Sequence, residues 1–276
     1  MSEINKALIL CANLDNKFLP LSKVVPKELW PLNGKPIIHH ILQEVKNAGI
    51  KKAVIVLGFN KKLISLYFKK NLKLEKILEK SEDEQSLTNL NSIQEFQKDI
   101  SISFITSEKP ITNAQAILKA KTKLGKSPFV VLSCDSIFSA NTPSILQLLK
   151  IFKTCGKPVI ALNKAVDEDD NENNIVEIEK IANRLFKIRK IISNPSSENN
   201  SSNLIISGKY IFVPEIFEYL KPKKIKDQQE ITLVNTLKSI LKDGKIIYGY
   251  EIEGKWLSLK DKASYLQSNI YLSSKK

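Results

Sequence analysis

Glycine is scarce in this chain. Nine glycines in 276 residues is about half the usual frequency of this residue. Glycine takes up left-handed backbone conformations at little cost and lets the main chain come close to a ligand, so its shortage limits where tight turns against phosphate can form. The polar segment after the first apolar run is Asn13-Leu14-Asp15-Asn16-Lys17 and contains no glycine. The common glycine-rich phosphate-binding loops are therefore excluded at this position.

Arginine is almost missing, although the chain is basic. The formal net charge is +14, yet only Arg184 and Arg189 among the 43 basic residues are arginines. Nucleic-acid recognition favours the planar guanidinium group, and the lysines are spread along the chain instead of being gathered in one basic arm. We expect a solvated, lysine-rich surface and do not expect nucleic acid as a partner. Binding of other anionic partners by this surface stays open.

Long apolar runs and an even set of cysteines are missing too. No run of about 18 apolar residues occurs, and the N-terminus leads straight into a strand pattern, so we expect neither a membrane span nor a signal peptide. The expected location is cytoplasmic. Cys11, Cys134 and Cys155 lie far apart in the sequence. Two of them end apolar strands, which predicts reduced, partly buried thiols.

Short apolar runs alternate with amphipathic segments along the chain. We expect strands at 7–12, 53–57, 102–105, 129–134 and 159–162, and later at 175–178, 185–192, 204–213 and 246–252. Helices are expected at 36–48, 60–68, 114–124, 142–155 and 230–242, after 214 and from 261 onward. Residues 71–98 are charged and helical in period, which predicts an insertion packed on the outside. The alternation predicts an α/β fold with a Rossmann-like, mostly parallel central sheet flanked by helices.

The first turn is the feature around which the chain is organised. A buried parallel strand delivers its carboxyl end to a ligand crevice, and this strand breaks abruptly into a polar loop. Lys17, Lys23 and Lys27 follow closely. Their spacing is suited to surrounding a polyphosphate.

Short motifs along nearly the whole chain resemble those of the bacterial UTP–glucose-1-phosphate uridylyltransferases, which belong to the sugar-phosphate nucleotidyltransferases. The matching motifs are Phe18-Leu19-Pro20, Pro26-Lys27-Glu28, Lys35-Pro36, Ala48-Gly49-Ile50, Ser202-Asn203-Leu204, Gly208-Lys209-Tyr210-Ile211, Pro214-Glu215-Ile216-Phe217, Glu230-Ile231 and Gly254-Lys255. Each is weak alone, but they agree in order and spacing. The resemblance implies the glycosyltransferase-A-like architecture of that family, with a small antiparallel sugar-side portion. It also implies one nucleotidyltransferase-like domain over 1–276, with a nucleotide-side half (1–140) and a sugar-side half (141–276).

The resemblance implies a reaction in which the glucose-1-phosphate oxygen attacks the α-phosphorus of UTP and expels pyrophosphate, with Mg²⁺ as cofactor. It assigns Lys17 and Lys27 to neutralising the triphosphate and Asp135 to the metal. The nucleotide-binding positions are Ala12, Asn13, Leu14, Glu28, Ser107 and Thr112. The sugar-binding positions are Asn174, Ser193, Asn194 and Gly208.

The nucleotide side departs from the family pattern. Where the family has Gly-x-Gly-Thr-Arg, residues 13–17 place side chains in the space for the nucleotide. Asp15 adds a carboxylate, and a like-charge pair 4 Å apart costs about 4 kcal/mol at an effective dielectric near 20. Ser107 stands for the uracil-reading glutamine, and residues 112–115 stand for Gly-Leu-Gly-His. The shorter side chain of Ser107 removes hydrogen bonds to the base, and the two lost glycines remove the close approach of the backbone to the nucleotide.

The metal and sugar positions depart as well. Ser258 stands where the family has a second metal-binding aspartate, and Lys260 replaces a glycine beside it. A single carboxylate holds Mg²⁺ more weakly than two. The family's Glu-Lys-Pro corresponds to Ser193-Asn194-Pro195, and Asn174 stands for a glycine that faces the sugar.

These departures favour a degenerate member of the family with weak, altered or absent activity. Two alternatives stay open. One is a non-catalytic regulatory or assembly partner of an intact relative, since the family forms homo-oligomers and a hetero-oligomer is physically available. The other is a nucleotidyltransferase of changed substrate specificity. If the chain is active, UTP and glucose 1-phosphate are the expected partners.

Overall fold

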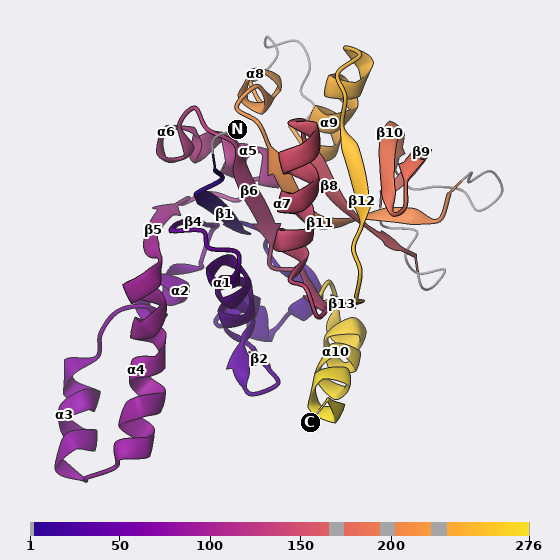
Figure 1. Ribbon diagram of the computed structural model, residues 1–276. Coiled ribbons are helices and arrows are strands. Elements are labelled where there is room, and N and C mark those ends of the chain that lie inside the picture. Colours follow the sequence, from indigo (N-terminus) through magenta and orange to yellow (C-terminus); the bar gives the residue numbers. More distant parts are fainter. Residues whose placement is uncertain (1–2, 166–173, 194–201, 222–230, 276) are drawn as a thin grey trace.

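A nine-stranded sheet forms the centre of the computed structural model, in the order β5-β4-β1-β6-β11-β8-β12-β10-β9 (Figure 1). The model describes residues 3–165, 174–193, 202–221 and 231–275. The strands are β1 (Lys6–Cys11), β2 (Pro31–Leu32), β3 (Lys35–Pro36), β4 (Lys52–Leu57), β5 (Ser101–Thr106), β6 (Phe129–Ser133), β7 (Ser136–Ser139), β8 (Val159–Lys164), β9 (Ile175–Ala182), β10 (Leu185–Ile192), β11 (Leu204–Phe212), β12 (Tyr248–Glu251) and β13 (Lys255–Ser258).

Helices cover both faces of this sheet. They are α1 (Ile37–Asn47), α2 (Lys62–Tyr67), α3 (Leu72–Lys80), α4 (Glu84–Asp99), α5 (Asn113–Lys119), α6 (Lys121–Leu124), α7 (Ser144–Cys155), α8 (Ile216–Tyr219), α9 (Leu233–Lys242) and α10 (Lys262–Ser274). Three short 3₁₀ helices, η1 (Asn16–Phe18), η2 (Leu21–Lys23) and η3 (Lys27–Leu29), follow the first strand.

The strand directions confirm the predicted mixed sheet. β5, β4, β1 and β6 are all parallel, and β12 is parallel to β8. β11 lies between β6 and β8 and is antiparallel to both, while β9 and β10 add an antiparallel pair at the far edge. The antiparallel pairings all involve strands of the second half of the chain, where we expected the smaller antiparallel portion, although β8 and β12 of that half are parallel to each other.

β1 separates two hydrophobic cores because its side chains alternate between the faces of the sheet. Ala7, Ile9 and Cys11 belong to the core that α1 and α7 cover. Leu8 and Leu10 belong to the core under α5 and α9. A strand that is apolar on both faces is typical of a buried parallel sheet. This burial explains the continuous apolar run in the sequence.

The charged segment at 71–98 forms the helical hairpin α3–α4, which projects from the body at the lower left of Figure 1. The turn between its helices is set by Asp83, whose side chain accepts a hydrogen bond from the backbone N–H of Ser86 at 2.9 Å. The C-terminal part of α4 reaches the core through the buried Phe96 and the partly buried Ile93. The prediction of a helical insertion was correct, although it projects further from the body than a packed insertion would.

Asparagine and aspartate take over part of the role of the missing glycines. Asp15 (φ 53°), Asn33 (φ 47°) and Asn60 (φ 64°) all lie in the left-handed region. These two residue types tolerate that conformation better than other side chains. Gly58 is a different case, because a Cβ there would lie 2.4 Å from the carbonyl oxygen of Ala12. The ends of β1 and β4 approach so closely that only glycine fits.

Two small sheets were missed from sequence. β2 pairs with β3, and β7 pairs with β13 in antiparallel register, with Ser136 opposite Ser258. β7 and β13 are four residues each and lie more than a hundred residues apart in the chain, so no local periodicity marks them. Their pairing places Trp256 and Ser258 next to the end of β6.

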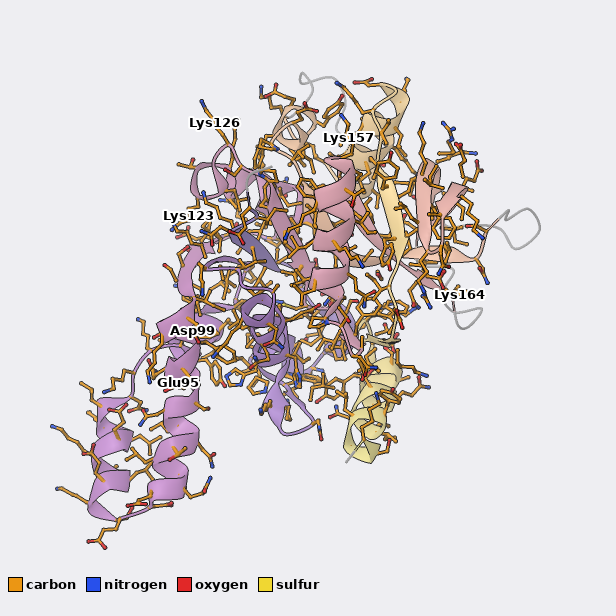
Figure 2. The ribbon with its side chains drawn as sticks, viewed as in Figure 1. Glu95, Asp99, Lys123, Lys126, Lys157 and Lys164 are labelled. Carbon is orange, nitrogen blue, oxygen red and sulfur yellow. The ribbon has the colours of Figure 1, made fainter. Side chains whose placement is uncertain are left out.

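The surface and the thiols agree with the composition. The lysines labelled in Figure 2, such as Lys123 in α6, Lys157 after α7 and Lys164 at the end of β8, lie on separate parts of the surface. Cys11 and Cys134 are buried free thiols. Within the described residues, the longest apolar helices fall short of what crossing a membrane requires.

Candidate active site

A cavity of about 510 Å³ opens at the carboxyl ends of β1 and β6 and receives residues from both halves of the chain. Of the expected catalytic, nucleotide-binding, sugar-binding and metal positions, six line it: Asn13, Lys17, Lys27, Asp135, Asn174 and Gly208. Asp15, Asn113, Trp256, Ser258 and Lys260 also contribute to its wall. Its volume lies within the range of small-molecule sites. Positions that are far apart in sequence thus share one site.

Lys27 and Asp135 form the central contact of this cavity. Lys27 is 2% exposed, and its ammonium donates to Asp135 Oδ1 and, at 3.1 Å, to the carbonyl oxygen of Leu259. Asp135 Oδ2 accepts from Asn13 Nδ2 and from Ser133 Oγ, each at 3.0 Å. Burial lowers the pKa of Lys27, but the nearby carboxylates, Asp135 foremost, outweigh it, so the pKa of Lys27 lies above its ordinary value. The lysine stays charged and holds the carboxylate.

Asp15 lines the cavity but forms ion pairs with two buried lysines. Lys61 Nζ donates to Asp15 Oδ2 at 2.7 Å and to Glu28 Oε1 at 2.6 Å, and Lys27 Nζ lies 3.6 Å from Asp15 Oδ1. The side chain of Asp15 is only 4% exposed. The sequence-based estimate treated Asp15 as an unpaired negative charge facing the triphosphate. Two lysines compensate that charge, so the estimate of about 4 kcal/mol does not apply.

Lys61 was missed by sequence reasoning. Burial lowers the pKa of Lys61, but Glu28 and Asp15 outweigh this and hold the pKa above its usual range. The available signal was its position four residues after the end of β4. Because β4 is parallel to β1, the segments that follow the two strands lie at the same edge of the sheet. Because the chain is so rich in lysine, its sequence did not distinguish Lys61 from the surface lysines.

Five of the six expected nucleotide-binding positions lie outside the cavity wall, four of them close to the loop or to α5. Ala12 is buried beneath the loop, and Leu14 is 45% exposed and points elsewhere. Glu28 is buried against Lys61. Thr112 caps α5, with its hydroxyl donating to the carbonyl oxygen of Ile231 at 2.6 Å.

Ser107 also lies outside the cavity. It lines a separate groove of about 630 Å³ together with residues such as Lys23, Phe59 and Lys62. Its hydroxyl donates to the carbonyl oxygen of Lys109 at 2.9 Å. A base-reading contact from this side chain is therefore not assembled in the main cavity.

The sugar-side positions gather around Asn174. Ser193 Oγ donates to Asn174 Oδ1 at 2.9 Å, and Lys238 Nζ donates to Ser193 Oγ at 2.9 Å. Gly208 has a φ of +79°, and a Cβ there would lie 3.1 Å from the Cβ of Ser133. Glycine is thus required where β11 passes the end of β6. Asn194 and Pro195 lie outside the described residues.

Two polar atoms in the cavity wall are buried without a hydrogen-bond partner. They are Asn113 Oδ1 and Ser258 Oγ. Buried polar groups are normally paired, and an unpaired one costs about 1–3 kcal/mol. A polar ligand in the cavity would supply partners for both.

The residues present do not fit a resident Mg²⁺ ion. Among the described residues of the cavity wall, the carboxylates are Asp15 and Asp135, and both are already paired with buried lysines. Ser258, which stands where the family has a second metal-binding aspartate, offers a neutral hydroxyl. Magnesium prefers several oxygen ligands in octahedral geometry, including carboxylates free to bind it. It would have to displace the ammonium of Lys27 from Asp135.

The Asp135 pair predicts a specific acid dependence. Burial raises the pKa of Asp135, but Lys27 foremost, together with Lys61 and Ser133, outweighs it, so the pKa lies below the ordinary carboxyl value. A depressed pKa contributes stability above the unfolded-state value of about 3.9, and this contribution is lost as the pH falls. We expect Asp135→Asn to be less stable than wild type at pH 6, with the difference shrinking below about pH 4. Urea unfolding across this range measures it, and a difference independent of pH would contradict it.

A mostly parallel sheet with a polar cavity at the carboxyl ends of its strands is the arrangement of doubly wound α/β proteins, in which ligands bind at this edge of the sheet. A sequence model of the family described as nucleotidyl transferase matches residues 6–274. The chain therefore belongs to the nucleotidyl transferase family. Members of this family generally use a divalent metal ion.

Curated relatives match almost the whole chain. UTP–glucose-1-phosphate uridylyltransferase 1 of Staphylococcus saprophyticus is 32% identical over 274 residues, covering 99% of this chain and 94% of the relative. The UTP–glucose-1-phosphate uridylyltransferase of Staphylococcus epidermidis is 30% identical over 271 residues, covering 98% and 92%.

Solved structures agree with the fold. A UDP-glucose pyrophosphorylase complexed with UDP-glucose superposes with a TM-score of 0.84 at 25% identity, covering 99% of this chain and all of the other. A UTP-bound UGPase from Acinetobacter baumannii superposes with a TM-score of 0.88 at 23% identity, covering 99% and 95%. The predicted nucleotidyltransferase architecture is confirmed.

Proposed function

We propose that this chain is a UTP–glucose-1-phosphate uridylyltransferase-like protein that binds a uridine nucleotide or nucleotide sugar in the main cavity but transfers the nucleotidyl group slowly. The curated relatives carry that activity in their names, and one solved relative is complexed with UDP-glucose. The cavity wall brings Lys17, Lys27 and Lys260 together with Asp15 and Asp135, so its positive charges exceed its negative ones. This balance favours an anionic ligand.

We expect slow transfer because the carboxylate of Asp135 is already bound by neighbouring side chains. Its oxygens are held by Lys27, Asn13 and Ser133, and the position that would supply a second carboxylate is Ser258. Transfer to a phosphorus centre depends on stabilising the charge that develops on oxygen. A site whose carboxylate is neutralised by its own lysine binds an anion without assembling that stabilisation.

The chain's own residues have defined roles in this proposal. Lys17 stands at the cavity wall and adds positive charge where a phosphate would enter. Lys27 is the deeper cation, but Asp135 competes with any phosphate for it. Asn113 Oδ1 and Ser258 Oγ are buried polar atoms available to a ligand's donors. The cavity therefore supplies groups that bind an anionic ligand, but fewer of the groups that catalyse the transfer.

We expect UDP-glucose or UTP to stabilise the protein against heat. A ligand at 100 times its dissociation constant adds about 2.7 kcal/mol to the free energy of unfolding. Thermal unfolding with and without millimolar nucleotide measures this. The matched control variant is Lys23→Met, because Lys23 lines the separate groove beside Ser107, whereas Lys17→Met removes a charge from the main cavity. The shift should fall for Lys17→Met and persist for Lys23→Met.

Pyrophosphate release with Mg²⁺, UTP and glucose 1-phosphate tests the rate. Losses of about 2 kcal/mol at each of three places, the metal position at Ser258, the base-reading position at Ser107 and the sugar-side positions at Ser193 and Asn194, would lower it by roughly four decades relative to an intact enzyme. Turnover at ordinary enzyme rates would refute the slow-transfer part. A screen of other nucleoside triphosphates and sugar phosphates would reveal changed specificity. A complete lack of stabilisation by any nucleotide would favour an assembly partner of an intact relative.

A further inference from the structure

Two thiols and a carboxylate meet beneath the first loop, outside the cavity wall. Cys11 ends β1, Cys134 directly follows β6, and Glu28 belongs to η3. The two sulfur atoms lie 3.6 Å apart. A carboxylate oxygen of Glu28 lies within 4.8 Å of both sulfurs, and all three side chains are buried. Because Leu10 pairs with Ser133 in the parallel register of β1 and β6, the residues that follow them, Cys11 and Cys134, lie side by side.

Only one of the two carboxylate oxygens of Glu28 has a hydrogen-bond partner in the protein. Its Oε1 accepts a hydrogen bond from Lys61 at 2.6 Å. Its Oε2 is buried and has no hydrogen-bond partner, although the residue is only 2% exposed. Buried carboxylate oxygens are normally paired with a donor or coordinate a metal ion. The unpaired oxygen therefore points to a missing ligand.

The sulfur spacing has a chemical meaning. Zinc–thiolate bonds of about 2.3 Å at the tetrahedral angle place two sulfurs about 3.8 Å apart. The observed 3.6 Å is close to this edge length. Sulfur ligands select soft or borderline cations such as zinc, whereas Mg²⁺ takes oxygen ligands. The donor set therefore distinguishes this cluster from the Asp135 site.

We propose that Cys11, Cys134 and Glu28 form a binding site for one zinc ion. The two thiols would bind as thiolates after losing their protons, and their charge would balance that of the ion. Lys61 keeps its bond to the other oxygen of Glu28 and orients the carboxylate from outside. The ion would join the ends of β1 and β6 to η3, directly below the loop that carries Asn13 and Asp15.

Zinc content measures this proposal directly. The full chain is expressed in zinc-supplemented medium, purified without chelator and analysed for metal, and its zinc affinity is measured by competition with a chromogenic chelator. We expect one zinc ion per chain. Cys11→Ala and Cys134→Ala should each weaken zinc binding by more than about a hundredfold, the upper end of the cost of losing an outer-shell partner. Cys155→Ala is the matched control, since this third thiol is only half buried at the end of α7.

A second measurement guards against variants that fold poorly. Cadmium added to the wild-type protein should produce the ultraviolet charge-transfer absorption of a metal bound to two thiolates, and zinc should displace it. Zinc retained equally by Cys11→Ala and the wild type would overturn the proposal. So would a wild-type protein that binds neither metal, or one that forms a Cys11–Cys134 disulfide in place of taking up metal.

Discussion

Replacing Lys209 with methionine is expected to lower the free energy of unfolding by about 3–5 kcal/mol. Lys209 lies on β11 with no exposed surface, and its ammonium pairs with Glu44 of α1. Glu44 also accepts hydrogen bonds from Ser144 Oγ and, at 3.0 Å, from the backbone N–H of Ile145 at the start of α7. This ion pair joins one sheet strand to two helices. Methionine fills similar volume but leaves the carboxylate buried without its cation.

The matched control is Lys98→Met on α4. Lys98 pairs with Glu95 at 2.6 Å, but the two side chains are 68% and 57% exposed, so less than about 1 kcal/mol should be lost. Urea unfolding followed by circular dichroism measures both variants. The double variant Lys209→Met/Glu44→Gln removes both charges but keeps an acceptor oxygen for Ser144 and Ile145, and should recover most of the loss. Equal losses for Lys209→Met and Lys98→Met would show that burial does not govern the pair.

The fold could be predicted because its information is local. β1, β4 and β6 are apolar runs that are buried on both faces, and the helices between them repeat apolar residues at helical spacing. The pairing of β7 with β13 could not be predicted, since each strand is short and its partner is remote. Sequence pattern thus gave the layers but not the small sheet that places Ser258.

The site was predictable only in part, because ion pairs depend on side-chain direction. Lys27 and Asp135 were both singled out, yet as ligands for phosphate and metal, not as partners of each other. Asp15 was read as a repulsive charge because nothing in the sequence connects it with Lys61, 46 positions away. Its left-handed backbone likewise shows that a missing glycine need not mean a missing turn. Comparing the loop with the family motif residue by residue therefore overestimates the effect of its substitutions, because residues outside the loop, such as Lys61, compensate for them.

Introducing a carboxylate at Ser258 is expected to raise Mg²⁺-dependent pyrophosphate release from UTP and glucose 1-phosphate. Ser258 lines the cavity, and its hydroxyl is buried without a partner. In Ser258→Asp a second carboxylate would face the cavity near Asp135 and compete for Lys27, which frees oxygen ligands for a divalent ion. If this stabilises the transition state by about 2 kcal/mol, the rate rises about 30-fold.

The control for Ser258→Asp must add the same charge without adding a ligand. Ser139→Asp does so, because Ser139 lies at the other end of β7, opposite Lys255, and is not part of the cavity wall. Rates are measured against Mg²⁺ concentration, since a new carboxylate ligand should lower the concentration needed for half-maximal activity, whereas a general electrostatic effect should not. A folded Ser258→Asp protein that binds nucleotide but stays as slow as the wild type would show that the missing carboxylate does not limit the rate. The remaining difference from an intact enzyme would then lie with Ser107, which lines a separate groove, or with the sugar-side positions, because a new carboxylate at Ser258 changes neither.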